Sequence, residues 1–321
     1  MPVTLGVVMD PIQGIKPYKD STFAMLLAAR ARGWHIRYFE PGDLYMRDGV
    51  ARGRWRALEV RDDRTDWYTL SAGGDIALAE IDIILMRQDP PITNAYLYIT
   101  YILECAEAAG ALIANRPGSV RDANEKLFAA RFPQCMVPTL VSSDSARLRQ
   151  FIREQGDVIV KPLDAMGGAG VFRLTADGPN IGATLEILTA LDTLHVMAQR
   201  YIPEIRTGDK RILLINGEPI PFALARIPQD GETRGNLAAG GRGEGRELTA
   251  RDRWIAAQVG PTLREKGLFF VGIDVIGDYL TEINVTSPTC IRELDAAFGL
   301  DIAGQLLEHL AARLTGGKRM R

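Results

Sequence analysis

The sequence predicts an α/β protein that begins with a doubly wound parallel sheet and continues with an α+β second half. Short β-branched runs alternate with alanine- and leucine-rich segments up to about Asp122, which is the pattern of consecutive β-α-β units. Beyond that point strand pairs follow each other closely, as around Asn216-Gly217, a strong hairpin signal. A chain of 321 residues is long enough for roughly two domains.

The expected elements of the first half follow this alternation. Strands are expected at residues 5–9, 35–40, 81–87 and 111–117. Helices are expected at 21–33, with Asp20 or Ser21 as its cap, and at 96–109 before Gly110. Residues 43–75 hold many arginines, aspartates and tryptophans without a clear period. We therefore expect a hairpin and loop excursion there.

The second half is expected to mix hairpins with single helices. Helices are predicted at residues 123–132, 145–155, 185–190, 254–266 and 302–314, and strands at 137–143, 157–163, 171–174, 195–202, 211–224, 268–276 and 279–285.

Composition limits the classes of function. The chain is 46% apolar and 24% charged, with a formal net charge of −2, so charge gives no argument for a nucleic-acid or membrane partner. Three widely spaced cysteines form neither a disulfide framework nor a zinc pattern. The start resembles a buried strand rather than a signal peptide, and no apolar run could span a membrane. We expect a cytoplasmic protein.

Three oxygen-bearing side chains occur on the last two expected strands. Glu282 and Asn284 are two residues apart, so they point to the same face of a strand. A three-residue loop at Gly277–Tyr279 would pair Asp274 with Glu282, whereas a two-residue loop would pair it with Thr281. Such a cluster suits Mg²⁺. The alternative is a solvated strand face.

A glycine-rich loop follows the strand that ends at Lys161. Gly167, Gly168 and Gly170 could present successive backbone N–H groups to a phosphate, with Lys161 adding charge. The spacing is not that of a Walker A loop. A mobile hairpin turn is the alternative, and Lys126, upstream in NEKLF, could equally be an ordinary surface lysine.

Two further segments carry weaker signals. The strand Ala198–Pro203 could offer backbone groups to an adenine ring, or could simply connect two domains. Residues 227–247 are rich in glycine and arginine and include Arg234; they could form a closing lid or a disordered linker. Cys290 has no histidine nearby in sequence, so we interpret it as a small packed residue rather than a nucleophile.

Taken together, these segments resemble the ATP-grasp superfamily and, within it, the bacterial glutathione synthetases. The resemblance spans nearly the whole chain except about residues 50–75 and the tail. It rests on VVMDPI, KDSTFAMLL, ILMRQDPP, NRPGSVRDANEKL, KPLDAMGGAGVFR, GDKRILLINGEPIP, ARIPQDGETRGNLAAGGRGE and GIDVIGDYLTEINVTSPTCIRE. One departure is Ala165, where the family often has glycine.

The resemblance implies an ATP- and Mg²⁺-dependent ligase, with Mn²⁺ as a possible substitute, that joins γ-L-glutamyl-L-cysteine to glycine through an acyl phosphate. It implies a parallel-sheet substrate domain at residues 1–122 and a two-lobed ATP-grasp domain. The lobes are a central lid subdomain at 123–201 and a C-terminal subdomain at 202–321, with a flexible loop at 227–247. A homo-oligomer, tetramer or dimer, is also implied.

The family's functional residues transfer position by position. The resemblance implies metal ligands Asp274, Glu282 and Asn284; nucleotide contacts Lys126, Lys161, Gly167, Gly168, Gln199, Tyr201, Ile202 and Asp209; catalytic Arg211, Arg226 and Arg234; and substrate contacts Ser287, Pro288, Thr289 and Arg292. Two rival functions remain: another ATP-grasp ligase, such as a D-alanine–D-alanine or glutamate ligase, and a non-catalytic ATP-binding module.

Overall fold

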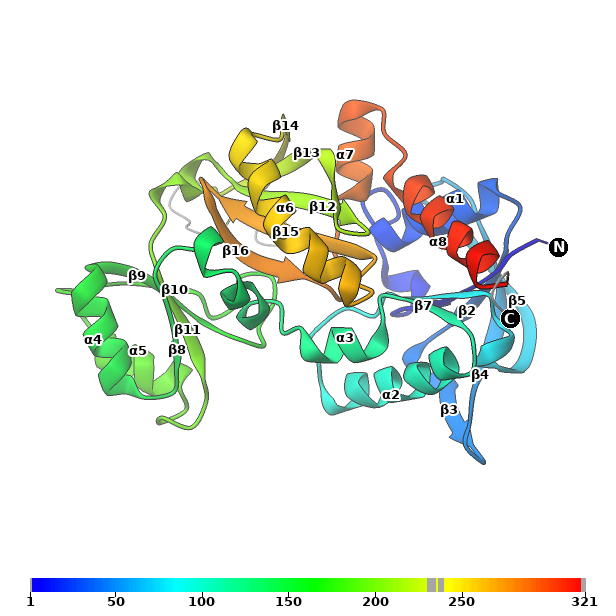
Figure 1. The fold of residues 1–321 in the computed structure, drawn as a ribbon, viewed down its shortest axis with the longest axis horizontal. Coiled ribbons are helices and arrows are strands. Elements are labelled where there is room, and N and C mark those ends of the chain that lie inside the picture. The colour runs from blue at the N-terminus through cyan, green and yellow to red at the C-terminus, as the bar shows by residue number, and fades with distance from the viewer. Residues whose placement is uncertain (1, 230–234, 236–239, 319–321) are drawn as a thin grey trace.

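A computed structural model describes residues 2–229, 235 and 240–318 of the chain. It contains three β-sheets, which follow one another along the sequence within residues 4–114, 139–200 and 209–284. In Figure 1 the first sheet lies at the right, the second at the left, and the third between them. No helix among the described residues is long and apolar enough to span a membrane.

The first sheet has four consecutive parallel strands that run to one edge and an antiparallel set of three strands toward the other edge. Its strand order is β3-β4-β2-β1-β6-β7, with β5 paired to β4. The strands are β1 (Thr4–Val8), β2 (His35–Phe39), β3 (Leu44–Arg47), β4 (Val50–Val60), β5 (Tyr68–Ala77), β6 (Ile83–Met86) and β7 (Leu112–Ala114). The helices are α1 (Ser21–Ala31), α2 (Asn94–Ala108) and α3 (Pro117–Asp122). The parallel, doubly wound prediction is confirmed, because β2, β1, β6 and β7 all pair in parallel.

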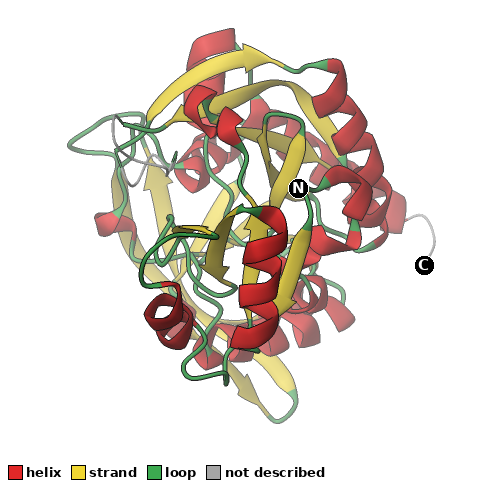
Figure 2. Ribbon diagram, turned by 90° about the vertical axis from the view of Figure 1, so that its left-hand side faces the viewer, coloured by secondary structure: helices red, strands yellow, loops and turns green. Residues whose placement is uncertain are grey.

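The second sheet is small and fully antiparallel, in the order β10-β9-β11-β8. Its elements are β8 (Thr139–Ser142), α4 (Ser145–Gln155), β9 (Asp157–Pro162), β10 (Phe172–Thr175), α5 (Ile181–Leu188) and β11 (Val196–Arg200). Helices α4 and α5 cover its outer face, at the left of Figure 1 and nearest the viewer in Figure 2. They share an apolar core with the strands.

The third sheet has the order β14-β13-β12-β15-β16 and is also antiparallel. Its elements are β12 (Asp209–Ile215), β13 (Glu218–Ile227), β14 (Arg242–Glu247), α6 (Ala250–Glu265), β15 (Phe270–Ile276) and β16 (Tyr279–Asn284). The predicted hairpin is confirmed, since Asn216 and Gly217 both have positive φ, 50° and 77°.

The last two helices return to the first sheet. They are α7 (Ile291–Phe298) and α8 (Ile302–Lys318). Buried Leu294 and Leu306 belong to the same apolar core as Phe23 of α1 and Leu5 of β1, and α8 lies beside α1 in Figure 1. The first and third sheets are therefore joined through a common core, whereas the core of the second sheet is separate.

The turn between β15 and β16 gives the expected pairing by an unexpected route. Asp274 pairs with Glu282, but Ile276 pairs with Tyr279, so the turn has only two residues, Gly277 and Asp278. A β-bulge next to Asp274 absorbs Thr281 and shifts the register by one residue. The predicted three-residue loop is wrong, and the predicted shared face of Asp274 and Glu282 is confirmed.

Two other expectations are wrong, and a third is confirmed in part. Residues 123–132 form a short 3₁₀ turn at Leu127–Arg131 instead of an α-helix, because the Asn124 side chain accepts the backbone N–H groups of Lys126 and Leu127. The hairpin expected within residues 43–75 is confirmed, since β4 pairs antiparallel with β5, but β3 also pairs with β4, so strand replaces most of the expected loop. The loop expected at 227–247 ends earlier, since Arg242–Glu247 is β14.

A pair of glycines tests the packing of α6 against the β12–β13 hairpin. A Cβ at Gly260 would overlap the carbonyl oxygen of Gly217. Alanine normally stabilises a helix by up to about 1 kcal/mol relative to glycine. At position 260 the overlap with Gly217 should make alanine destabilising instead. We predict that Gly260→Ala lowers the thermal midpoint, at a cost of about 1–3 kcal/mol.

The matched control is Gly182→Ala in α5, where a Cβ would meet only the flexible end of Arg149. This substitution should leave the midpoint unchanged or raise it. Equal effects of the two alanines in thermal unfolding would contradict the packing described for α6.

Candidate active site

A deep cavity lies between the second and third sheets. It offers about 870 Å³, including its open mouth, and receives residues from β9, β11, β12, β15 and β16. This size suits a nucleotide-sized ligand. Its walls include the sequence-predicted residues Lys126, Lys161, Gly167, Gly168, Gln199, Tyr201, Ile202, Asp209, Asp274 and Glu282.

Two buried lysines converge on one carboxylate in this cavity. The Nζ atoms of Lys161 and Lys126 lie 3.4 Å and 3.9 Å from Oε1 of Glu282. Lys126 also donates a hydrogen bond to the carbonyl oxygen of Ala165 in the glycine-rich loop. Lys161 comes from the second sheet and Glu282 from the third, so the lysines concentrate positive charge where the two sheets meet, as a phosphate site requires.

The strand β11 and the residues after it form one wall. Gln199 is buried, and its amide donates a hydrogen bond of 3.2 Å to the Thr139 hydroxyl. The Tyr201 ring lies 3.8 Å from the Arg173 guanidinium carbon, and Ile202 adds a buried apolar side chain. A wall with apolar and aromatic side chains can hold a planar heterocycle.

Behind the lysines lies a buried network of arginine and aspartate. Asp274 accepts hydrogen bonds from Arg211 at 2.5 Å and 3.0 Å and lies 2.9 Å from Arg226. Arg226 also bridges to Asp209. Burial alone would raise the pKa of Asp274, but Arg211 and Arg226 hold it below its usual range.

For Asp209 the effect of burial on the pKa outweighs that of the neighbouring arginine. Burial raises the pKa of Asp209 to about 6, although Arg226 acts against this shift. Its Oδ1 atom is buried without a hydrogen-bond partner among the described residues. A buried acceptor of this kind at the wall of a cavity is available to a donor on a ligand.

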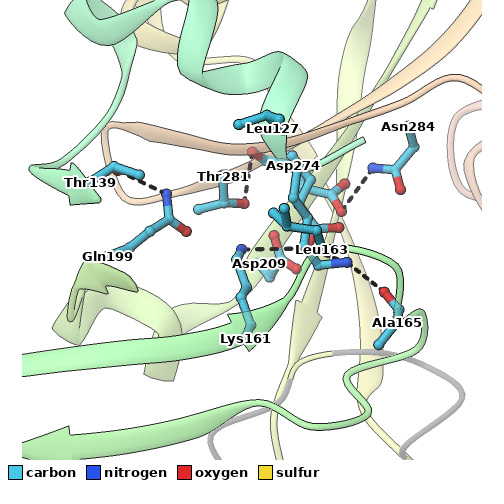
Figure 3. Close-up of polar contacts among 12 residues, drawn as sticks. Leu127, Thr139, Lys161, Leu163, Ala165, Gln199, Asp209, Asp274, Thr281 and Asn284 are labelled. Atoms are coloured by element: carbon cyan, nitrogen blue, oxygen red, sulfur yellow. Dashed lines mark hydrogen bonds and ion pairs between the residues drawn. The ribbon is translucent and has the colours of Figure 1, made fainter. Parts of the chain in front are cut away.

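Three side chains of this region fit a divalent metal. Asp274, Glu282 and Asn284 share one face of the β15–β16 pair, and Figure 3 shows Asn284 and Lys161 around Asp274. The amide nitrogen of Asn284 donates a hydrogen bond of 3.2 Å to a carboxylate oxygen of Asp274. Described residues form no group of three or more His, Cys, Asp or Glu that could hold a metal alone. Two carboxylates and an amide suit Mg²⁺, which usually also takes phosphate and water oxygens.

A second cavity of about 850 Å³ adjoins the first. The two share the wall residues Lys126, Ala165, Met166, Gly167 and Glu282. The second cavity is lined further by the predicted residues Arg211, Arg226, Asn284, Ser287, Pro288 and Thr289, together with Cys290. Ligands in the two cavities would meet at Glu282 and the glycine-rich loop.

Some wall residues were missed by the sequence analysis. Asp89 and Glu125 line the second cavity, and the Ser287 hydroxyl donates a 2.5 Å hydrogen bond to Asp89. Close by, buried Arg87 donates to the Pro288 carbonyl oxygen at 2.9 Å. For Arg87 and Asp89 the sequence does contain a signal, because the segment RQD directly follows a buried strand. Ligands bind at the carboxyl ends of parallel strands, so these residues were candidates for a site.

Among the predicted residues that the structure describes, Arg292 is not brought into either cavity. Arg292 forms a 2.8 Å ion pair with Asp62 in the connection between β4 and β5, away from both linings. Arg234 lies outside the described residues. Cys290 is buried, lines the second cavity and has a φ of 91°. Burial raises its pKa, which agrees with a packed thiol rather than a nucleophile.

Solved structures identify the fold as that of the ATP-grasp ligases. The chain aligns with D-cycloserine synthetase DcsG with a TM-score of 0.68 and 18% identity, covering 97% of this chain and 99% of that one. It aligns with the ATP-grasp ligase PsnB, complexed with minimal precursor, Mg and ADP, with a TM-score of 0.62 and 18% identity, covering 97% and 98%. The chain therefore has the fold of these ATP-grasp proteins.

Sequence comparison is more specific. The model of the prokaryotic glutathione synthetase N-terminal domain matches residues 3–121, and that of the prokaryotic glutathione synthetase ATP-grasp domain matches residues 125–299. The chain is 60% identical to the glutathione synthetase of Pseudomonas putida KT2440, covering 98% of this chain and 99% of the relative. It is 54% identical to that of Escherichia coli K12, covering 97% and 99%. The chain belongs to the prokaryotic glutathione synthetase family and is an ATP-dependent ligase.

The buried arginine–aspartate network predicts a large stability effect. Arg226→Met would leave Asp209 with no cation within ion-pair distance among the described residues and Asp274 with only Arg211. Loss of one partner from a buried pair costs about 3–5 kcal/mol. We expect a clear fall in the urea midpoint of the ligand-free protein.

Arg264→Met is the control, because the Arg264–Glu218 pair has side chains that are 38% and 77% exposed. Exposed pairs contribute about 0–1 kcal/mol. If Arg226→Met and Arg264→Met shift the midpoint equally, the network does not neutralise the carboxylates as described.

Proposed function

We propose that the two adjoining cavities carry out the glutathione synthetase reaction, with ATP in the first and γ-L-glutamyl-L-cysteine and glycine in the second. The cysteinyl carboxylate attacks the γ-phosphorus of ATP, which gives an acyl phosphate and ADP. The ammonium group of glycine loses one proton, and its nitrogen then attacks the acyl carbon. The C–N bond forms as the bond to the phosphate oxygen breaks, and phosphate leaves with that electron pair. One of the three ammonium protons stays on the amide, one leaves on phosphate and one is released.

The observation that carries this proposal is the shared wall of the two cavities. Lys126, Gly167 and Glu282 line both, so the γ-phosphate of a nucleotide in one cavity and a carboxylate in the other would meet there. Phosphoryl transfer needs mainly positioning and neutralisation of charge. The cations around this wall supply both without a Ser-His-Asp triad.

Each cation has a distinct role in the proposal. Lys126 and Lys161 bind the β- and γ-phosphates. Arg211 and Arg226 lie on the acceptor side of the wall, where they stabilise charge on the transferring phosphoryl group and on the acyl phosphate. Asp274, Glu282 and Asn284 would hold Mg²⁺, for which Mn²⁺ can substitute. The bound ion would neutralise phosphate charge and fix the orientation of the triphosphate.

The remaining site residues complete the proposal. Gln199, Tyr201, Ile202 and Asp209 surround the nucleoside, and Gly167 and Gly168 present backbone N–H groups to phosphate. Ser287, Pro288 and Thr289, which line the second cavity, contact the substrates at the acceptor end. We assign Arg234 to stabilisation of the intermediate and Arg292 to the acceptor end; the latter would require Arg292 to leave Asp62.

Three broader assignments belong to the same proposal. The division into residues 1–122, 123–201 and 202–321 is supported by the connections between the three sheets, which contain both boundaries. A segment within 227–247 closes over the acyl phosphate and excludes water. The enzyme acts in the cytoplasm as a homo-oligomer, a dimer or tetramer.

Substitution of one metal ligand tests the site. In Glu282→Gln we expect Mg²⁺-dependent release of ADP, measured with γ-glutamylcysteine and glycine, to fall at least about 100-fold, because a charged ligand to the ion is lost. The circular dichroism spectrum should be unchanged. Activity within twofold of the parent would contradict the metal assignment.

The substrate requirement of the parent enzyme separates the rival functions. ADP should appear only when γ-glutamylcysteine and glycine are both present. ADP release that depends on D-alanine would indicate the other ligase class, and ATP binding without any turnover would indicate a non-catalytic module.

A further inference from the structure

Two acidic side chains of the second cavity, Asp89 and Glu125, have no part in the reaction as assigned above. Asp89 is exposed and Glu125 is half-buried, so Glu125 is the one whose charge needs a partner. Glu125 precedes Lys126 and lines this cavity with Glu282. The acidic residues of the nucleotide cavity all pair with cations: Asp209 with Arg226, Asp274 with Arg211 and Arg226, and Glu282 with Lys161 and Lys126. Glu125 has no lysine, arginine or histidine within ion-pair distance in the described part of the chain.

The Glu125 carboxylate is held rigidly by one of its two oxygens. Oε1 accepts hydrogen bonds from the backbone N–H groups of Val285 and Thr286, at 2.9 Å and 3.1 Å, and from the Thr286 hydroxyl at 2.8 Å. The Glu125 backbone oxygen also accepts the Ile283 N–H at 2.8 Å. These contacts fix Glu125 against the end of β16.

The second oxygen, Oε2, makes no hydrogen bond to any described residue, and it is not a fully buried atom. Burial raises the pKa of Glu125, although the hydrogen bonds from Thr286 oppose that shift. An ionised carboxylate in such surroundings is unfavourable unless a cation lies against it. A rigid carboxylate with one free oxygen at a cavity wall is therefore suited to bind a cationic group of a ligand.

The reacting molecules offer two ammonium groups. That of γ-glutamylcysteine lies at the far end of its γ-glutamyl chain from the reacting carboxylate. The ammonium of glycine becomes the nucleophile, and it must come within about 3–3.5 Å of the acyl carbon. Glu125 adjoins Lys126 and the end of the strand that carries Glu282 and Asn284, so its position matches the nearer group.

We propose that Glu125 is the ammonium-binding residue of the acceptor site, where its free oxygen Oε2 receives the –NH₃⁺ group of glycine and places its nitrogen beside the acyl carbon. One proton then leaves to solvent before the nitrogen attacks. This inference rests on the proposed function. It means that the acceptor site selects for a positively charged amine. A neutral nucleophile would gain nothing from Glu125.

Glu125→Gln tests the proposal with little disturbance to the fold, because the glutamine Oε1 can still accept the three hydrogen bonds from Val285 and Thr286. The nitrogen that replaces Oε2 is a donor and repels an ammonium group. We expect KM for glycine to rise about 10- to 100-fold. The KM values for ATP and γ-glutamylcysteine should stay within about twofold.

Hydroxylamine provides a readout that a purely structural role would not give. It is largely uncharged at neutral pH and can trap an acyl phosphate. ADP release with γ-glutamylcysteine and hydroxylamine should therefore be nearly the same in Glu125→Gln and in the parent. Glu186→Gln makes the same chemical change on the exposed face of α5 and should alter neither activity.

Several results would overturn the proposal. They are an unchanged KM for glycine, an equal loss of the glycine and hydroxylamine activities, a raised KM for γ-glutamylcysteine instead, and a shifted Mg²⁺ requirement, which would indicate a second metal ion at Glu125. A parent enzyme that releases no ADP with either nucleophile would contradict the proposed function itself.

Competition experiments on the parent enzyme give an answer that does not depend on how the variant folds. N,N-dimethylglycine keeps a positive charge but cannot form the amide, whereas glycolate carries a hydroxyl group in its place. We expect glycolate to compete with glycine at least about tenfold more weakly than N,N-dimethylglycine. Equal competition by both compounds would contradict an ammonium site.

Discussion

The arrangement of the active site depends on the neutralisation of carboxylates that are buried where the second and third sheets meet. Asp274 is only 3% exposed, and a charge in that position is very unfavourable without partners. Arg211 and Arg226 supply those partners on one side, and Lys126 and Lys161 supply them for Glu282 on the other. The result is a compact set of alternating charges that triphosphate, metal and acyl phosphate can enter with little reorganisation.

The backbone provides this arrangement through one irregularity. Without the bulge at Thr281, the two-residue turn at Gly277-Asp278 would pair Asp274 with Thr281, and Glu282 would point to the opposite face. The bulge brings Asp274 and Glu282 together, and Asn284 follows two residues later on the same face. Thr281 also donates its hydroxyl to the Asp274 carbonyl oxygen at 3.1 Å, which stabilises the bulge locally. A single extra strand residue thus positions the proposed metal site.

The sequence predicted most of the fold, because most elements carry a strong local signal. Capped, alanine-rich helices such as Ser21–Ala31 and buried strands such as Ile83–Met86 follow their expected patterns. The failures have local causes. The side chain of Asn124 forms an Asx-type turn where a helix was expected. Strands β4 and β5 carry charged residues such as Arg52 and Asp75, which form an ion pair of 2.5 Å. These charged residues obscure the alternation of apolar and polar residues that identifies a strand.

The candidate site was predicted from the family resemblance more than from periodicity. Spacing alone related Glu282 to Asn284, since two residues on a strand share a face. It could not find Glu125, Asp89 or Arg87, whose positions depend on contacts 160, 198 and 201 residues apart in the chain. Arg292 shows that a match to the family does not by itself place a residue in the site. Its side chain forms an ion pair with Asp62 outside both cavities.

The most direct test of the central claim is a crystal structure with Mn²⁺ and a non-hydrolysable ATP analogue, in which anomalous scattering locates the ion. The account predicts one strong peak about 2 Å from carboxylate oxygens of Asp274 and Glu282 and in contact with the β- and γ-phosphates. An ion bound elsewhere, with Asp274 still enclosed by Arg211 and Arg226, would contradict it.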